Sequence, residues 1–472
     1  MAELGVVVES IDDWYQRLID DAELATYSDV RGCMILLPYG LQIWSKIREL
    51  LTAEFNKNNV HEVYFPTLIS AEIYQKHMGN YECFHAGLPD NISDTHTESL
   101  YVIRPTSEVV FGKYFSSIAL SYRDLPMLYN QWCNVFRPEM RTRFFLRTTE
   151  ILWQEGHGVH ETFEDADRFI FTIHKSYEKV LLGDLLLCGC SGEKPSFDRF
   201  PGSSKTLTVE CMMQDGKALQ SATSHVLGQH YSKKLNILFQ NRSGEKELAF
   251  TSSWGTSTRD VGAVILTHGD SSGINLPTAI APFHFVIIPV GFSEDVVNYC
   301  MKIYENLLKK CRVFLDLNQH HTFSAKKWTY IKKGVPYIIL IGAKETNSNS
   351  VFVVSRSDNL YENTLSLSEF DVKISSLLDE HDSRLKAKAQ DYFKKNTNSF
   401  TSCAELLSYF KEGGKGFALG YCYDSDEVVA SHLVNTALSV RCLLTPGNSG
   451  EEGKCIFSGV KTNKLAVFAK SY

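Results

Sequence analysis

The sequence predicts an α+β protein: an antiparallel sheet with flanking helices, followed by a small α/β domain and a small α+β region at the carboxyl end. Two observations predict this. In residues 1–282 few strand-like runs are followed by a regular crossover helix, so antiparallel pairing fits better than a doubly wound sheet. From residue 283 short buried strands alternate with amphipathic helices, which is typical of a small α/β domain with a mixed or parallel sheet. We therefore expect domains at residues 1–282, 283–385 and 386–472.

The first domain contains helical and strand-like segments that the residue pattern separates. Apolar residues recur at three- and four-residue spacing through residues 41–58, as one face of a helix requires. Residues 60–65 indicate a strand that Pro66 ends, because proline has no amide hydrogen to donate to a neighbouring strand. We expect further strands at residues 100–103 and 127–136, and a long helix at residues 164–187.

The second domain begins with a buried-strand pattern at residues 283–289, which an amphipathic helix at residues 293–310 follows. Its other elements are expected as strands at residues 311–316, 337–341 and 351–354, with a second helix near residues 326–333. A helix at residues 367–389 is expected to connect this domain to the third region, whose own elements begin near residue 400.

The composition indicates an ordinary soluble globular protein. The 472 residues are 44% hydrophobic and 22% charged, and they carry a formal net charge of −7. No segment has the roughly 18 to 20 consecutive apolar residues that cross a bilayer, and the amino terminus lacks the basic region of a signal peptide. The negative charge argues against broad affinity for nucleic acid but allows a specific RNA partner at a local basic patch. Twelve cysteines without a disulfide framework indicate reduced thiols and a cytoplasmic location.

Four arginines lie within eleven residues: Arg137, Arg141, Arg143 and Arg147. Like charges this close repel each other, so such a cluster in an acidic chain needs a local reason. If two strands flank the intervening loop, Arg137 and Arg147 come close together and suit a polyanion such as a triphosphate. A solvated, charged hairpin is the alternative.

Residues 104–108 follow an expected strand and suit a small cationic ligand. Thr106 and Glu108 point the same way if the chain stays extended, so a hydroxyl and a carboxylate would face one ammonium group. The alternative is the start of a helix, with Thr106 or Ser107 as its cap and Glu108 in its first turn. Both descriptions are compatible with the same segment.

Residues 152–160 combine an aromatic ring, a carboxylate and two histidines. Trp153, Glu155 and His157 would form a pocket wall that suits a small cationic ring. A metal site is the alternative, because His157 and His160 lie three residues apart with Glu155 and Glu161 beside them. The spacing lacks the HExxH order of a zinc protease.

The last group of polar residues is divided among residues 220–229, 253–259 and 268–270. Arg259 follows a run of small hydroxyl residues and precedes an apolar segment. An arginine in such a position is usually a rim charge. Beside Arg137 and Arg147 it would instead be a third phosphate contact.

Taken together and in this order, these segments make the chain resemble the prolyl-tRNA synthetases of the archaeal and eukaryotic type, a family of class II aminoacyl-tRNA synthetases. The resemblance covers essentially the whole chain. The matching segments are residues 30–40, the helix and strand that end at Pro66, and residues 103–108, 130–137, 145–147, 153–157, 223–229, 253–255 and 468–472. This set is specific to the prolyl enzymes rather than to class II enzymes in general.

The resemblance implies a fold and an activity. The fold would be a class II catalytic domain, an anticodon-binding α/β domain and a small carboxyl-terminal domain, in a homodimer formed through the first helix and strand. The activity would be that of a proline–tRNA ligase, which converts ATP and L-proline to prolyl-adenylate and transfers the prolyl group to the 3′ end of tRNA-Pro. One alternative is another class IIa synthetase, such as a threonyl or histidyl enzyme. Another is a synthetase-like paralogue that senses tRNA or proline without charging, although such a chain would be expected to lose Arg137, Arg147 or Arg259.

The resemblance also implies roles for residues at matching positions. Proline would be bound by Thr106, Glu108, Arg137, Trp153, Glu155, His157 and His225. ATP would be bound by Arg137, Glu139, Arg147, Thr148, Gln220, Thr223, Ser257 and Arg259, with a magnesium ion near Gln220. Arg141 and Arg143 would face the tRNA acceptor end. Arg137, Arg147 and Arg259 would be catalytic, because both reactants are anionic and need charge neutralisation and alignment rather than a general base.

Two features of some relatives are expected to be missing. Many relatives bind zinc in the carboxyl-terminal domain through four cysteines. Here Cys422 and Cys455 supply two ligands, and Cys442 lies between them, so we expect no zinc. Residues 158–252 are too few for the editing domain that bacterial-type prolyl enzymes insert there, so we expect no hydrolysis of mischarged alanyl-tRNA.

Four lysines of the second domain, Lys326, Lys327, Lys332 and Lys333, lie on and just after one expected helix. They form either a basic face for RNA phosphates or the charged side of a solvated helix. The resemblance favours the RNA-binding face.

Overall fold

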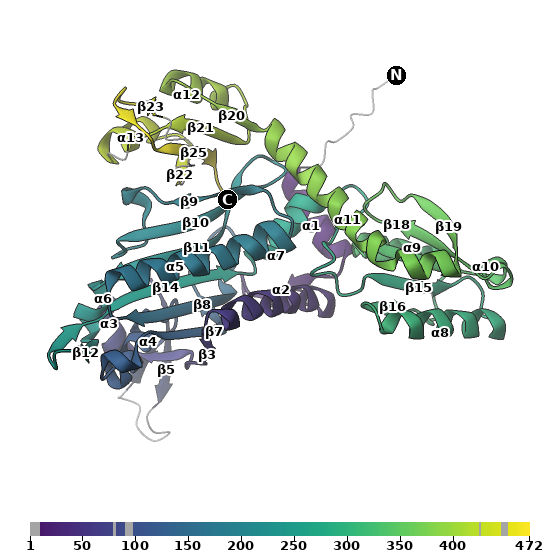
Figure 1. The fold of residues 1–472 in the computed structure, drawn as a ribbon, viewed down its shortest axis with the longest axis horizontal. Helices are drawn as coiled ribbons and strands as arrows, with labels where there is room; N and C mark the ends of the chain where they lie inside the picture. Colours follow the sequence, from purple (N-terminus) through teal and green to yellow (C-terminus); the bar gives the residue numbers. More distant parts are fainter. Residues whose placement is uncertain (1–9, 79–81, 90–97, 424–425, 445–451) are drawn as a thin grey trace.

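The computed structural model describes residues 10–78, 82–89, 98–423, 426–444 and 452–472. Figure 1 shows a wide sheet, crossed by helices, and a smaller α/β domain joined to it by the long helix α11 (Leu367–Lys395). In pairing order the strands of the wide sheet are β20 (Thr397–Ser399), β21 (Phe417–Tyr421), β25 (Leu465–Lys470), β22 (Leu438–Leu444), β9 (Gly189–Glu193), β10 (Lys205–Met212), β11 (Ala218–Gly228), β14 (Phe250–Ser257), β8 (Glu150–His160), β7 (Met127–Phe136) and β3 (His61–Glu62).

Antiparallel pairing dominates this sheet. Every neighbouring pair from β9 to β7 is antiparallel, so the predicted antiparallel sheet is confirmed. The strand expected at residues 127–136 is β7, with the same bounds. Residues 158–252 supply β9, β10 and β11 together with the helix that covers them, so this interval is part of the sheet structure itself.

The two long helices expected in the first domain are present. The helix α2 (Pro38–Lys57) begins with a proline, whose missing amide hydrogen would have had no partner in the first turn. The helix α5 (Phe163–Glu178) lies across β11 and starts where the Thr162 hydroxyl accepts a hydrogen bond from the Asp165 amide. It is shorter than the expected 164–187, because its last turns widen into a π-helix at Lys179–Asp184. The other helices here are α1 (Ile11–Asp21), α3 (Ala71–Met78), α4 (Glu108–Ile118), α6 (His230–Leu235) and α7 (Arg259–His268), with 3₁₀ turns at Tyr122–Asp124 and Ser196–Asp198.

The strand expected at residues 60–65 is longer than the strand that the structure contains. Of residues 60–65, only the two that form β3 pair with β7, because the Phe65 amide donates to the side chain of Gln131 (3.0 Å) and Pro66 follows. The strand expected at residues 100–103 is the end of β6. The smaller sheets are β1 (Ala25–Tyr27) with β2 (Met34–Leu36), β4 (Leu68–Ser70) with β6 (Glu98–Ile103) and β5 (Phe84–Pro89), β12 (Leu238–Gln240) with β13 (Lys246–Leu248), and β23 (Gly453–Lys454) with β24 (Lys461–Thr462).

The second domain has a mixed sheet, as its pattern predicted, and a fifth strand, β19, that was not predicted. The order is β16 (Val313–Leu315), β15 (Phe285–Pro289), β17 (Tyr337–Ile341), β18 (Ser350–Ser355) and β19 (Glu362–Ser366). The first three strands run parallel to one another, and β18 is antiparallel to both of its neighbours, β17 and β19. Its helices are α8 (Glu294–Leu308), α9 (Phe323–Lys332) and α10 (Ala343–Ser348).

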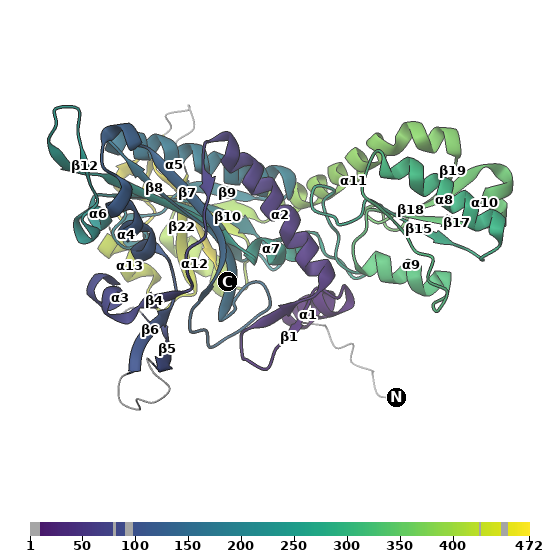
Figure 2. The same ribbon diagram turned by 90° about the horizontal axis from the view of Figure 1, so that it is seen from below.

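Polar contacts hold the second domain against the first. The guanidinium of Arg356 forms two hydrogen bonds of 2.7 Å to the Asp270 carboxylate, which lies just after α7. Lys332 at the end of α9 pairs with Asp21 of α1 (2.8 Å). Figure 2 shows α1, α7 and α11 at this junction, between the sheet and the smaller domain.

The third region extends the wide sheet rather than standing apart from it. Its strand β22 pairs with β9, where Leu443 lies opposite Glu193 and Leu444 opposite Gly192. The expected division at residues 385 and 386 lies inside α11, and the region's helices are α12 (Cys403–Lys411) and α13 (Asp426–Leu433). Side chains of the carboxyl-terminal strands therefore reach the neighbourhood of β9 and β10.

Candidate active site

A pocket of about 460 Å³ lies over the strands β8, β10, β11 and β14. It is lined by all the residues predicted to bind proline or ATP: Thr106, Glu108, Arg137, Glu139, Arg147, Thr148, Trp153, Glu155, His157, Gln220, Thr223, His225, Ser257 and Arg259. Arg141 and Arg143 do not line it. The structure thus brings four separate stretches of sequence to one cavity.

The strand β8 supplies one wall through alternate residues. Trp153, Glu155 and His157 are two residues apart, so their side chains fall on the same face of the sheet. Gly156, between Glu155 and His157, lies on the other face of the sheet. A Cβ at Gly156 would stand 2.0 Å from the ring of Trp254 on the neighbouring strand, so only glycine permits this close packing.

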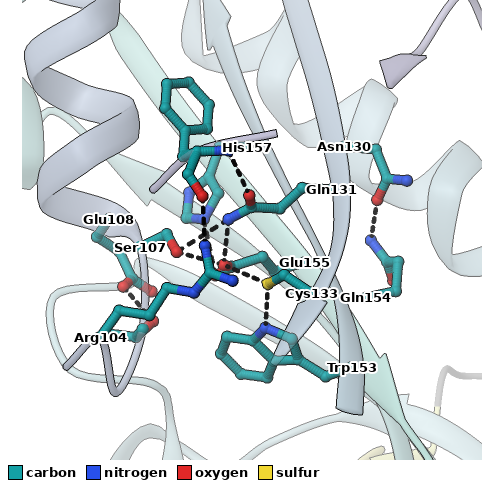
Figure 3. A network of polar contacts seen from close by, with 12 residues as sticks. Arg104, Ser107, Glu108, Asn130, Gln131, Cys133, Trp153, Gln154, Glu155 and His157 are labelled. Atoms are coloured by element: carbon teal, nitrogen blue, oxygen red, sulfur yellow. Dashed lines mark hydrogen bonds and ion pairs between the residues drawn. The ribbon is translucent and has the colours of Figure 1, made fainter. Parts of the chain in front are cut away.

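Glu155 is the centre of the buried network in Figure 3. Its Oε1 accepts hydrogen bonds from the Gln131 amide (2.6 Å) and from the Ser107 hydroxyl, and its Oε2 lies 3.6 Å from His157 Nε2. Burial alone would raise the pKa of Glu155. The contacts with His157, then Ser107 and Gln131, outweigh burial and lower that pKa below its ordinary value. The carboxylate is therefore ionised and held in one orientation.

Both descriptions of residues 104–108 hold in the structure. Glu108 is the first residue of α4, yet it faces the pocket and accepts a hydrogen bond from the Thr106 hydroxyl. Ser107 occupies the cap position, but its hydroxyl bonds to Glu155 rather than to the helix backbone. The loop is anchored by the buried Arg104, which donates to the carbonyl oxygens of Phe65 (2.6 Å) and Asn134 (2.8 Å).

The alternative of a metal site at His157 and His160 is wrong. His160 Nε2 lies 2.8 Å from the Ser252 hydroxyl, and burial lowers the pKa of His160 to about 4. Glu161 points away and forms an ion pair with Arg242 (3.0 Å). These side chains therefore do not converge on one point.

The indole of Trp153 has two polar neighbours. Its Nε1–H donates to the sulfur of Cys133 (3.2 Å), and the Arg137 guanidinium lies over the ring, 5.0 Å from its centroid. The Cys133 thiol lies 3.6 Å from Glu155, and burial raises its pKa. A neutral thiol thus helps to set the ring that separates Glu155 from Arg137.

The strand β11 supplies the opposite wall. Thr223 and His225 alternate toward the pocket, whereas Gln220 would face away in a regular strand. A register shift in the pairing with β10 skips Ser221 and turns Gln220 inward. The His225 ring lies within 3.1 Å of the Thr206 and Thr223 hydroxyls, and burial lowers its pKa to about 3, so it is neutral.

The arginine hairpin folds as the sequence predicted, with two strands flanking a loop. Arg143 and Arg147 pair across a tight turn, and the Arg137 amide donates to the Thr149 carbonyl (2.9 Å). Arg137 and Arg259 are each held through Nε by a backbone carbonyl, that of Pro105 (3.0 Å) and that of Leu146 (2.9 Å).

No carboxylate within the described residues forms an ion pair with Arg137, Arg147 or Arg259. Burial, and then the positive charges of Arg137 and Arg147, lower the pKa of Arg259. Three guanidinium groups therefore share one end of the pocket with their charge uncompensated. Such an end favours a polyanion.

Arg143 is committed to contacts within the chain. It pairs with Asp12 (2.9 Å), and its guanidinium lies over the rings of Tyr15 (4.5 Å) and Tyr472 (5.2 Å). Arg141 is exposed on the same hairpin. The two arginines predicted to face an RNA end therefore differ, and Arg143 serves the packing of the hairpin against the last residue of the chain.

Sequence reasoning missed one wall of the pocket, formed by Lys194, Asp198, Arg199, Phe200 and Thr206. Lys194 is buried and pairs with both Asp198 and Glu210 (3.0 Å each). The other oxygen of Glu210 accepts two hydrogen bonds from Arg441 of β22 (3.0 and 2.8 Å). The signal in the sequence was Glu210 between the apolar residues Val209 and Cys211 of a strand, which indicates a buried and paired charge.

The RNA-binding face predicted for Lys326, Lys327, Lys332 and Lys333 stays a prediction. Each ammonium forms an ion pair with a carboxylate, respectively that of Asp316, Glu362, Asp21 and Glu23. Lys326 is also buried. These ion pairs contribute to the structure of the domain and to its junction with the first domain.

Two global features complete the description. All twelve cysteines are free thiols. Within the described ranges, no three histidine, cysteine, aspartate or glutamate side chains converge as metal ligands, and no helix is long and apolar enough to cross a membrane. Residues 424–425 and 445–451, between Cys422 and Cys455, lie outside the described residues. The expected lack of zinc stays a prediction.

Comparisons with known proteins match this geometry. The model of the tRNA synthetase class II core domain (G, H, P, S and T) matches residues 91–268, and that of the anticodon binding domain matches residues 284–377. The proline–tRNA ligase of Akkermansia muciniphila is 36% identical over 98% of this chain and 98% of its own length; that of Paramagnetospirillum magneticum is 34% identical over 98% and 97%.

Solved structures agree. The prolyl-tRNA synthetase of Cryptosporidium parvum, complexed with halofuginone and AMPPNP, superimposes with a TM-score of 0.92 at 29% identity and covers 98% of this chain and 96% of its own. The enzyme of Giardia lamblia in complex with prolyl-adenylate superimposes with a TM-score of 0.90 at 28% identity, covering 98% of both chains.

Proposed function

The chain belongs to the prolyl-tRNA synthetases, and we propose how its pocket performs the reaction of that family. Relatives of the same length make the activity that of a proline–tRNA ligase. ATP and L-proline give prolyl-adenylate and pyrophosphate, and the prolyl group then passes to tRNA-Pro. No relative supports the alternative of a paralogue that senses tRNA or proline without charging it.

The position of Arg137 carries the proposal. Its guanidinium lies over the ring of Trp153. The carboxylates of Glu108 and Glu155 line the same cavity, as do Arg147 and Arg259. A zwitterion placed between them has its secondary ammonium among carboxylates and its own carboxylate at Arg137. Proline fits this polarity, because its ring lies against an indole face while both its charges are met.

The proline end is assigned as follows. Glu108, oriented by Thr106, accepts a hydrogen bond from the ammonium, and the fixed charge of Glu155 holds the electrostatic potential negative there. The neutral His225 closes the wall without adding a positive charge. Because the carboxylate of Glu155 is oriented before the ligand arrives, little reorganisation accompanies binding.

The ATP end needs electrostatics and alignment. An oxygen of the proline carboxylate attacks the α-phosphorus, the bond to the bridging oxygen breaks, and pyrophosphate leaves. The nucleophile is already ionised, so no general base takes part. Arg137 draws the carboxylate and the α-phosphate together, while Arg147 and Arg259 bind the outer phosphates, which gain charge in the transition state.

Glu139, Thr148, Gln220, Thr223 and Ser257 line this end and are proposed to bind the nucleotide. Magnesium is proposed to enter as part of MgATP. Mg²⁺ keeps several waters and is bound mainly by substrate phosphates and few protein oxygens. The amide oxygen of Gln220 beside the arginines fits such a minor ligand, and the ion would offset repulsion among the phosphates.

In the second step a hydroxyl of the terminal tRNA ribose attacks the prolyl carbonyl carbon and AMP leaves. The exposed Arg141, on the hairpin that carries Arg137 and Arg147, is proposed to contact the acceptor end. We do not assign that role to Arg143, whose guanidinium is held by Asp12, Tyr15 and Tyr472.

Incorporation of labelled proline into a tRNA-Pro transcript tests the whole reaction. Specificity is tested by ATP–pyrophosphate exchange with the twenty amino acids, where proline is expected to give the highest kcat/KM. Exchange with threonine or histidine but not proline would overturn the assignment in favour of another class IIa synthetase.

A homodimer is proposed from the edge of the sheet. The strand β3 is the last in the order, and the large side chain of Tyr64, two residues after it, is 71% exposed. Such a residue beside an open strand edge supports an interface. Light scattering of the purified protein is expected to give twice the chain mass, and Tyr64→Arg is expected to lower it. A cytoplasmic location is proposed as well, supported by the twelve free thiols.

A further inference from the structure

Four exposed lysines on three helices of the catalytic region lack a carboxylate partner among the described residues: Lys76 on α3, Lys113 on α4, and Lys233 and Lys234 on α6. The exposed His230 and the partly exposed His77 lie among them. We call these six residues the lysine face. In a chain with a net charge of −7, uncompensated positive charge on one surface needs an explanation.

The three helices are neighbours. Figures 1 and 2 both show α3, α4 and α6 grouped at the end of the sheet away from the second domain. α4 packs against both α3 and α6. Burial, and then the charges of Lys76, Lys113 and Lys234, lower the pKa of His77. The ammonium groups therefore act on a common point from all three helices.

The lysine face is distinct from the proposed dimer edge. Successive residues of a helix point about 100° apart, so Lys113 and Tyr114 face different sides of α4. Tyr114 turns toward β7, with its ring 6.2 Å from that of Tyr129, and toward Phe65 (5.6 Å). Lys113 is directed away from them, toward the side of α4 where His77 lies. Partner binding at β3 would leave the lysine face open.

The surface is hollowed beside Lys233 and Lys234. A pocket of about 500 Å³ is lined by these lysines, His230, and the rings of Phe163 and Phe250, whose centroids are 6.3 Å apart. The backbone of Gly202, with a φ of +82°, forms its rim, and a Cβ there would stand 2.5 Å from the His230 ring. Aromatic rings next to cations suit an unstacked base and its phosphate better than an acidic peptide, which would leave the rings uncovered.

We propose that the lysine face binds the phosphate backbone of RNA and that the adjoining pocket takes an unstacked base. That the RNA is tRNA rests on the function proposed above. Helix α4 begins at Glu108 in the proline pocket, and Lys113 is five residues further on, about 7.5 Å along the axis. RNA on this face would lie close behind the wall of the active site. The lysines on and just after α9, by contrast, form ion pairs with carboxylates.

The test compares two variants that remove four positive charges each. One is the lysine-face variant K76Q/K113Q/K233Q/K234Q. The matched control is K57Q/K175Q/K310Q/K395Q, whose lysines are also exposed but pair with carboxylates. Binding of a fluorescent tRNA-Pro transcript is titrated at several KCl concentrations. Each lost phosphate contact lowers the slope of log K against log salt by about 0.7 to 0.9.

The lysine-face variant is expected to lower that slope by about 3 to 3.5, and to weaken binding about tenfold or more in 0.1 M salt. The control is expected to keep the wild-type slope. Equal slopes in the two variants would overturn the proposal. ATP–pyrophosphate exchange should stay at the wild-type rate in both, since none of these lysines lines the active-site pocket. If the wild type failed to activate proline, the proposed function would fall, while the RNA titration would still decide the role of the lysine face.

Discussion

The two ends of the active-site pocket treat charge in opposite ways. At the proline end the carboxylates of Glu108 and Glu155 are buried, and each already accepts hydrogen bonds from neighbouring side chains. At the ATP end Arg137, Arg147 and Arg259 have no carboxylate partner in the described chain; Arg137 and Arg259 are held by backbone carbonyls instead.

This difference reflects the two ligands. One ammonium group needs one negative charge in a fixed orientation, and hydrogen-bonded side chains provide it without leaving buried charge unsolvated. A triphosphate brings several negative charges, which can neutralise several cations only if these are not already paired. The repulsion that lowers the pKa of Arg259 in the free protein is relieved when phosphates bind. The lysines of the lysine face likewise have no carboxylate partner among the described residues, whereas the lysines on and just after α9 are paired.

Removing a cation at the ATP end is expected to have the largest effect. Arg137→Ala should lower proline-dependent ATP–pyrophosphate exchange about 10³-fold or more, because the residue is proposed to contact both reactants. Arg141→Ala, on the same hairpin but outside the pocket, is the matched control and should keep the exchange rate. Near-normal exchange in Arg137→Ala would remove this residue from the mechanism.

Removing the fixed charge at the proline end is expected to act on proline alone. In Glu155→Gln the amide oxygen can take the place of Oε1 and keep the hydrogen bonds from Gln131 and Ser107, so the substitution removes the negative charge while leaving these contacts. We expect the KM for proline to rise about 10²-fold and the KM for ATP to change little, as measured by exchange kinetics. Ser107→Ala, which removes one of the hydrogen bonds, should show the same selectivity with a smaller rise. Equal effects on both substrates would contradict the separation of the two ends.

Lys194 is the exception at the pocket, a cation that is fully paired, and its pairing depends on Arg441 of the carboxyl-terminal region. Arg441→Met leaves the buried Glu210 with Lys194 and Thr208 as its remaining partners. We expect a loss of about 2 kcal/mol of stability, the low end for a broken buried pair, visible as a lower Tm. Arg441→Lys should recover part of it. An unchanged Tm in the methionine variant would show that this contact does not hold the third region to the sheet.

A buried acid beside Arg259 explains why that arginine stays unpaired. Asp260 is fully buried, and burial raises its pKa to about 8, against smaller opposing effects of Thr256 and Arg259. The Thr256 hydroxyl has a single proton and lies 2.8 Å from the Ser221 carbonyl and 2.5 Å from Asp260. If that proton goes to the carbonyl, Asp260 must be protonated and donate to Thr256. A neutral Asp260 does not cancel the charge of Arg259.

The pH dependence of stability follows from this raised pKa. The unfolded chain ionises Asp260 near its ordinary pKa of 3.8, whereas the folded chain keeps the proton up to about pH 8. The folded state therefore binds more protons between these values, and the stability contribution falls as pH rises through that window. Asp260→Asn retains a donor to Thr256 and removes the cost. Its free energy of unfolding should exceed that of the wild type by an amount that grows from pH 5 to pH 8 by about 1.4 kcal/mol per pH unit, visible as a rising difference in Tm. A difference that stayed constant with pH would mean that Asp260 is ionised in the fold.

The smallest effect is expected at the boundary between the two ends. Cys133→Ala removes the acceptor for the Trp153 indole while leaving every group that touches substrate in place. We expect a few-fold higher KM for proline at an unchanged kcat, because the ring that separates Glu155 from Arg137 is less firmly held. Cys133→Ser, which keeps an acceptor, should restore the wild-type KM, and failure to do so would argue against a positioning role.

The sequence by itself determined which residues meet on the predicted walls of the pocket, but not the wall that Lys194 and its neighbours form. A strand alternates its side chains, so Trp153, Glu155 and His157 had to share a face, and a hairpin had to bring Arg137 near Arg147. These relations are local and follow from the backbone. The one exception on the predicted walls is Gln220, whose inward direction depends on a register shift between two strands.

Only the tertiary structure decided which charges are compensated. Lys326 and Lys76 are indistinguishable as lysines on helices, yet Lys326 pairs with Asp316 and Lys76 has no carboxylate partner among the described residues. Arg441 reaches Glu210 because β22 pairs with β9, a contact between segments more than two hundred residues apart in the chain. Ion pairs form where distant segments come within about 4 Å, and no pattern along the chain encodes that distance. The residue types therefore identified the chemistry of the site, while packing determined which charges remain available to bind a ligand.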